Sequence, residues 1–265
     1  MSEASRAALS REYRDGTTRL RRMLVDTVTP MFADLGSWRS GDVAGFLDQV
    51  LPVTMGAQDA MARLTDTYLS ARLADRFGGE VPPLGAEAAQ AIRGIDPETV
   101  YRRPFAQLWT ELGNGTPFPL ALQHSTDRLV SIATTDLQLA KTHTSRDVFA
   151  AHDGVTHYLR VPRGSDSCAL CLIASTQPYT KANLQPIHPG CQCHVRETTD
   201  PTEGYDPELL DQVHEAVARD LGPEYRDYSG RDADYRQMVV TRDHGEYGPT
   251  LSVSGHRFTG PADIP

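Results

Sequence analysis

The segment "SDSCALCLIASTQPYTKANLQPIHPGCQCH", residues 165–194, contains all four cysteines of the 265-residue chain. A C-x2-C pair and a C-x-C pair lie near its two ends, and a histidine precedes the second pair. A structural zinc ion takes four ligands in a tetrahedron, and two short ligand pairs separated by a loop are the usual sequence form of such a site. The segment therefore predicts a zinc site with the candidate ligands Cys168, Cys171, His188, Cys191 and Cys193.

The five candidate ligands exceed the four positions of a tetrahedral site. We expect the first cysteine pair and Cys193 to bind the metal, and either His188 or Cys191 to complete the tetrahedron. His194 directly follows the last cysteine. We expect this histidine in the outer shell of the site or at the protein surface.

Two other interpretations of the cysteines remain open at the level of sequence. The four could form two disulfides, but the N-terminal "MSEASRAALSREYRDG" carries charge where a signal peptide needs an apolar core, which predicts a reducing compartment. The C-x2-C pair could instead be a redox or catalytic thiol site, but no thioredoxin-like βαβ pattern surrounds it.

Apolar residues recur at intervals of three and four through most of the N-terminal half, which is the pattern of helices that bury one face. The pattern predicts a helical region over residues 1–80 and a second over residues 86–150, separated by the helix-breaking "RFGGEVPPLG". Pro52 is expected to end a helix, because proline lacks the amide hydrogen and clashes with the preceding turn. The sequence "DPET" is expected to start one, with Asp96 as the cap and Pro97 in the first turn.

The sequence pattern changes after residue 150. "VTHYLRV", at 155–161, alternates apolar and polar residues and predicts a strand with Tyr158 and Arg160 on its polar face. This strand and the cysteine segment define a small zinc-binding module over residues 151–198. Residues 199–265 are expected to form an acidic amphipathic helix and an extended tail, with "TLSVSGHRF" as a strand-like piece. The predicted fold class is therefore α+β, mostly helical at the N-terminal side.

The net charge of −9 is unevenly distributed. Residues 199–265 carry 14 acidic and 6 basic side chains, whereas the first 198 residues carry 21 and 20. A nearly neutral body with an acidic tail lacks the basic stripe of a DNA-binding surface, so we expect weak or no direct nucleic-acid binding. No apolar run approaches the roughly 18 residues of a membrane helix, so we expect no membrane association.

Serines and histidines near the cysteine segment are the candidates for hydrolytic chemistry. A protease needs a nucleophile, a base and an orienting group held in one geometry, which closeness in sequence does not provide. The chain contains neither G-x-S-x-G nor H-E-x-x-H, and a zinc ion with four protein ligands has no position left for a reacting water. A structural protein is therefore favoured over an enzyme that would use Ser165, Ser167, His152 or His157.

The stretch running from "YLRVPRGSDSCALCLIAS" to "PIHPGCQCHVRE" resembles the C-terminal core of the Mu F-like phage head morphogenesis proteins, also called minor capsid proteins. Members of that family commonly show a short strand, a C-x2-C pair, a loop and then His-Pro-x-Cys-x-Cys. The close similarity spans about 40 residues of this chain, and a long helical region precedes the core in both. The family often has a glycine after the first pair, where this chain has "ASTQPY".

The resemblance implies a structural component of a tailed-phage virion that lies inside the head near the portal vertex, and in the host cytoplasm during assembly. The implied partners are the portal protein and other phage capsid proteins, and the implied cofactor is structural Zn2+. Some relatives in actinobacterial phages are labelled capsid maturation proteases. That activity is the alternative expectation for this chain.

Overall fold

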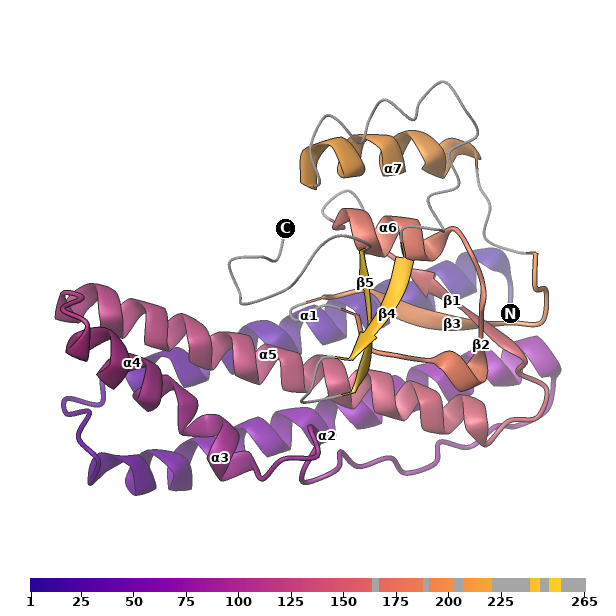
Figure 1. The fold of residues 1–265 in the computed structure, drawn as a ribbon. Coiled ribbons are helices and arrows are strands. Elements are labelled where there is room, and N and C mark those ends of the chain that lie inside the picture. Colours follow the sequence, from indigo (N-terminus) through magenta and orange to yellow (C-terminus); the bar gives the residue numbers. More distant parts are fainter. Residues whose placement is uncertain (164–166, 188–190, 203–206, 221–238, 244–247, 254–265) are drawn as a thin grey trace. The chain divides into compact units, whose positions relative to one another are not determined.

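The computed structural model describes residues 1–163, 167–187, 191–202, 207–220, 239–243 and 248–253 (Figure 1). The chain divides into two compact units. The helical unit comprises residues 1–65 and 85–141, and the cysteine unit comprises residues 66–84 and 142–265. The division falls inside two long helices, between Thr65 and Asp66 and between Lys141 and Thr142.

The helical unit is built from five helices, two of which continue into the cysteine unit. Asp96 caps the third of them by accepting a hydrogen bond from the Thr99 amide at 3.1 Å, with Pro97 in the first turn. The helix start that "DPET" predicts is therefore confirmed. The elements are α1 (Glu3–Ala33), α2 (Asp42–Phe77), α3 (Pro97–Tyr101), α4 (Arg103–Gly113) and α5 (Phe118–Ala150).

Three phenylalanines form the centre of the core of the helical unit. The rings of Phe32, Phe46 and Phe105 pack edge to face, with centroids 5.1 to 5.5 Å apart. Edge-to-face pairs of this kind add about 0.5–1.5 kcal/mol each to the burial of the rings. The indole of Trp38 donates to the carbonyl of Phe32 at 2.9 Å, and this hydrogen bond ties the turn after α1 to the core.

The expectation that a helix ends at Pro52 is wrong, because α2 runs through this residue to Phe77. Val50 before it is fully buried, and Met61 beyond it is 4% exposed. The apolar face therefore continues across the proline. Burial of that face outweighs the roughly 3 kcal/mol that an interior proline costs an isolated helix.

The cysteine unit contains a three-stranded antiparallel sheet in the order β2–β1–β3. In β1 (His157–Val161), Tyr158 pairs with Tyr179 of β2 (Tyr179–Thr180) and with Glu197 of β3 (His194–Thr198). The interior residues of β1 are all buried, including Arg160, which is 5% exposed. The expected polar face of this strand is therefore wrong, because the strand is central and covered on both faces.

Helix α6 (Ala169–Ser175) is buried along its whole length. One side joins the cysteines, Ile187 and Leu251 in an apolar cluster, and the other side packs on Val213 and Val217 of α7 (Pro207–Asp220). Figure 1 shows α6 and α7 side by side. A short 3-10 helix, η1 (Lys181–Asn183), follows β2. The amphipathic helix predicted after residue 199 is thus confirmed as α7.

The tail contributes a β-hairpin to the cysteine unit. β4 (Val239–Asp243) pairs antiparallel with β5 (Pro249–Val253), and Leu251 donates its amide hydrogen to the Pro186 carbonyl at 3.0 Å. The strand predicted from "TLSVSGHRF" is confirmed over the residues that the structure describes. Its partner β4 was not predicted, because "VVTRD" is too short to show a clear alternation.

The C-terminal turns of α2 pack against the sheet within the cysteine unit. Arg72 forms a bidentate ion pair with Glu197, at 2.9 and 2.8 Å. Farther along α2, the ring of Phe77 lies so close to the backbone before β1 that a Cβ on Gly154 would be 2.8 Å from it. Only glycine fits at that position without a shift of the ring.

The α+β fold class is confirmed, with a mostly helical N-terminal region and a small sheet module that carries the cysteines. Among the described residues, no helix combines the length and the apolar character that crossing a bilayer requires.

Candidate metal centre

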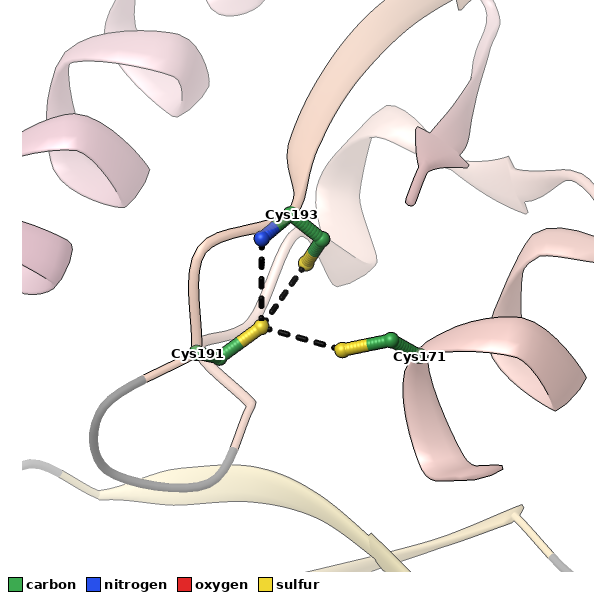
Figure 2. Close-up of side chains that lie close together, drawn as sticks. All are labelled: Cys171, Cys191 and Cys193. Atoms are coloured by element: carbon green, nitrogen blue, oxygen red, sulfur yellow. Dashed lines mark hydrogen bonds between the residues drawn. The ribbon is translucent and has the colours of Figure 1, made fainter. Parts of the chain in front are cut away.

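The cysteines reach one place from two different elements. Cys168 caps α6, and Cys171 lies in the first turn of that helix. Cys191 and Cys193 lie on the segment that leads into β3. Figure 2 shows the side chains of Cys171, Cys191 and Cys193 pointing toward one another, so the helix start and the strand start face a common centre.

Three sulfur atoms form a tight buried group. The Sγ of Cys191 is 3.1 Å from the Sγ of Cys171 and 3.1 Å from the Sγ of Cys193. A disulfide requires about 2.05 Å, so neither of these two sulfur pairs is a disulfide. Metal–sulfur bonds of about 2.3 Å in a tetrahedron hold sulfurs roughly 3.8 Å apart. A zinc ion would therefore need only a small outward movement of these side chains.

Cys168 lies beside this group at its more exposed side. Its Sγ accepts a hydrogen bond from the Cys171 amide at 3.4 Å, and its thiol also interacts with the Cys171 thiol. It is half-buried, whereas the other three cysteines are buried. His188, the remaining candidate ligand, lies outside the described residues, as do the two residues that follow it.

Without a cation, the surroundings of these sulfurs disfavour negative charge. Hydrogen bonds with Cys168 and the other cysteines, together with burial, raise the pKa of Cys171 well above its usual value. Burial is the main reason that the pKa of Cys191 is also well above its usual value. A bound metal cation reverses this preference, because a coordinating thiol is deprotonated outright. The group is thus suited to hold a divalent cation.

Arg160 belongs to this site, although the sequence pattern placed it on a polar face. Its Nη1 donates to the Cys193 Sγ at 3.5 Å, and its Nη2 donates to the Gln185 carbonyl. Burial by itself would lower the pKa of Arg160, but its electrostatic interactions with Cys193 and Tyr158 raise it above the usual value. The strand pattern missed Arg160 because it assumes one solvated face. The feature of the sequence that could have identified Arg160 is an arginine inside a predicted strand next to the cysteine segment.

His194 is buried rather than at the surface, with 4% of its side chain exposed. Its ring packs edge to face on Tyr68, with the centroids 5.8 Å apart. The histidine therefore anchors the start of β3 to α2 within the cysteine unit.

The serines and histidines considered for hydrolysis have other contacts in the structure. Ser167 Oγ accepts a hydrogen bond from the Arg163 amide at 2.9 Å. His157 Nδ1 is 3.0 Å from the Thr156 hydroxyl, and the ring of His152 packs on Phe77. The remaining candidate, Ser165, lies outside the described residues.

Comparison with known proteins identifies the family. A mostly helical α+β chain with a buried cysteine group defines only a broad class of proteins. The model of the VG15 protein family matches residues 3–217, which include every helix from α1 to α6 and the whole cysteine segment. The chain therefore belongs to the VG15 protein family, and this membership is consistent with a phage protein. No curated protein and no solved structure matched the chain.

Proposed function

We propose that this chain is a structural minor capsid protein of a tailed phage, located inside the head at the portal vertex, whose cysteine unit folds around a zinc ion. Membership of the VG15 protein family supports the phage assignment. The resemblance of the cysteine segment to the Mu F-like head morphogenesis proteins supports the head and portal assignment. The portal protein and other capsid proteins are the proposed partners, without direct binding of nucleic acid or membrane.

The single observation that carries the zinc assignment is the convergence of Cys171, Cys191 and Cys193, whose sulfurs lie within 4.8 Å of one another in a buried place. Cys168 is the proposed fourth ligand, because its thiol already interacts with that of Cys171. The coordination set is then four thiolates, and His188 is the competing fourth ligand. The ion would supply a crosslink between α6 and β3.

A structural role for the metal follows from the chemistry of this ligand set. Four protein ligands saturate a tetrahedral zinc ion, whereas catalytic zinc keeps one position for water. The apolar cluster around the sulfurs is small: besides the cysteines it contains Leu170, Ala174, Ile187 and Leu251, with Tyr179 and Val239 partly buried against it. Small modules with cores of this size commonly depend on a metal for their folding.

The zinc assignment is tested by metal analysis of the purified full-length protein. About one equivalent of zinc per chain is expected, and Cys171→Ser or Cys191→Ser should abolish binding. The choice of fourth ligand is tested by comparing Cys168→Ser with His188→Asn, with His157→Asn as the matched control in the same unit. Less than about half an equivalent in the wild-type protein, with no destabilisation by a chelator, would contradict the proposal.

The location in the head is tested by a separate experiment. The chain is co-expressed with the portal and major capsid proteins of the same phage, and purified heads are probed for it. The proposal expects a small number of copies per head and retention by the portal. Absence from the heads would contradict the structural role. Loss of capsid-protein cleavage in Ser167→Ala or His157→Ala, with zinc content intact, would favour the maturation protease instead.

A further inference from the structure

Arg160 is a buried positive charge beside the sulfurs. Its side chain belongs to the central strand of the sheet and is 5% exposed. A guanidinium is charged at all relevant pH values, and moving a lone ion out of water costs several kcal/mol. The fold therefore has to provide a negative group near this position.

The contacts of Arg160 contain no carboxylate among the residues that the structure describes. The guanidinium contacts the Cys193 sulfur and the Gln185 carbonyl, and it lies over the Tyr158 ring with its carbon 5.9 Å from the centroid. Its Nε has no hydrogen-bond partner among these residues. The nearby Glu197 is paired with Arg72 at 2.8 Å. A sulfur is thus the contact that can carry the balancing negative charge.

A metal ion bound by four thiolates needs a positive charge nearby. Four thiolates on a divalent cation leave a net charge of about −2 in a buried place, and such a charge is stable only when it is paired and hydrogen-bonded. An N–H donor to a ligating sulfur fixes the orientation of that ligand and takes up part of its charge. Arg160 supplies both a donor and a full positive charge.

We propose that Arg160 is a positioning residue of the metal centre, which donates to the Cys193 thiolate and serves as the buried counter-charge of an anionic metal–thiolate complex. The inference rests on the proposed zinc function. The second donor, to the Gln185 carbonyl, ties the loop before Cys191 to β1. One side chain thus links the sheet, this loop and a ligating sulfur.

The test uses Co2+ in place of zinc in the full-length protein, because its absorption bands report both ligand type and geometry. The affinity is measured by competition with a chelator. Arg160→Gln removes the charge and is expected to weaken Co2+ binding about 10–100-fold and to shift the sulfur-to-cobalt charge-transfer band. Arg146→Gln, which changes an exposed arginine of the same unit, is the matched control and should leave both unchanged.

The outcomes separate the two proposals. Failure of the wild-type protein to bind Co2+ or zinc overturns the metal centre itself. Wild-type binding with an unchanged affinity and spectrum in Arg160→Gln overturns the role of Arg160 and leaves the metal centre standing. Where Arg160→Gln does not fold, Arg160→Met decides the matter, because methionine fills much of the same apolar space but removes both the charge and the N–H donors. Weaker binding and a shifted band in that variant support the proposal, and wild-type values overturn it.

Discussion

Each of the two units buries an arginine, and the two arginines are neutralised in different ways. In the helical unit, Arg93 Nε is 2.6 Å from Asp136 Oδ1, and Tyr101 donates to the other oxygen of that carboxylate at 2.8 Å. In the cysteine unit, Arg160 meets a sulfur and a carbonyl oxygen. The helical unit thus contains a carboxylate counter-charge for its buried arginine, whereas Arg160 contacts a sulfur that is a counter-charge only when it is ionised.

The difference shows how the two cores are stabilised. The helical unit has large aromatic side chains in contact and a charge pair closed by hydrogen bonds. The cysteine unit also has aromatic rings in contact, with the centroids of Tyr158 and Tyr179 5.4 Å apart, but its sheet and α6 meet at a buried group of sulfurs that disfavours negative charge. We therefore expect the helical unit to be stable without metal and the cysteine unit to depend on it. The predictions below test this contrast in order of decreasing effect.

Metal removal should produce the largest effect. A strong chelator is expected to release hydrogen-exchange protection in β1, α6 and β3 and to leave protection in residues 118–141 of α5 unchanged. We expect metal binding to stabilise the folded cysteine unit by on the order of 10 kcal/mol, as in small zinc modules. Mass spectrometry of exchanged peptides measures both units in one sample. If chelation left hydrogen-exchange protection unchanged in both units, the predicted difference between them would be contradicted.

Breaking the charge pair of the helical unit should have the next largest effect. Asp136→Asn leaves Arg93 buried without its counter-charge, and we expect a loss of about 3–5 kcal/mol in the free energy of unfolding. Asp127→Asn, on an exposed position of the same helix, is the control and should change little. Denaturant titration measures the loss. Zinc content should stay at the wild-type level, and a drop in it would show that the units are not independent in the way proposed.

The ion pair between Arg72 and Glu197 allows the same kind of test within the cysteine unit. Here an arginine has a carboxylate partner, so this pair should behave like that of the helical unit. Glu197→Gln is expected to cost about 1.5–3 kcal/mol, because it weakens two charge-assisted hydrogen bonds. Thermal unfolding of the metal-loaded protein measures the change, with the exposed Glu215→Gln as control. An unchanged melting temperature would mean that the metal alone determines the stability of this unit.

The smallest effect is expected at the start of α2. Hydrogen bonds from the Ser37 hydroxyl, at 2.8 Å, and the Arg39 amide, at 2.7 Å, lower the pKa of Asp42. A lowered pKa means that the stabilisation is present above the ordinary carboxyl pKa and is lost as pH falls through the folded value. The difference in stability between wild type and Asp42→Asn should therefore narrow as pH falls below about 4. If this difference in stability stayed constant with pH, the charge on Asp42 would not contribute to the stability of the fold.

The sequence predicted the helices well where the pattern was strong and local. The start at Asp96 and the helix after residue 199 could be read from periodicity and capping residues. The passage of α2 through Pro52 could not, because local chemistry disfavours it and only the buried face on both sides of the proline overrides that preference. The pairing of β4 with β5 depends on contacts between distant residues.

The candidate site, too, has features that the sequence predicts and features that only the tertiary structure shows. The sequence by itself determined that the candidate ligands are mostly cysteines, because two short cysteine pairs around a loop are the usual sequence form of a zinc site. Only the tertiary structure decided that Cys191 joins the group with its sulfur 3.1 Å from two others, and that Arg160 faces the sulfurs. The physical reason is that spacing fixes which residues a turn can bring together, whereas burial of a strand on both faces depends on elements far away in the chain.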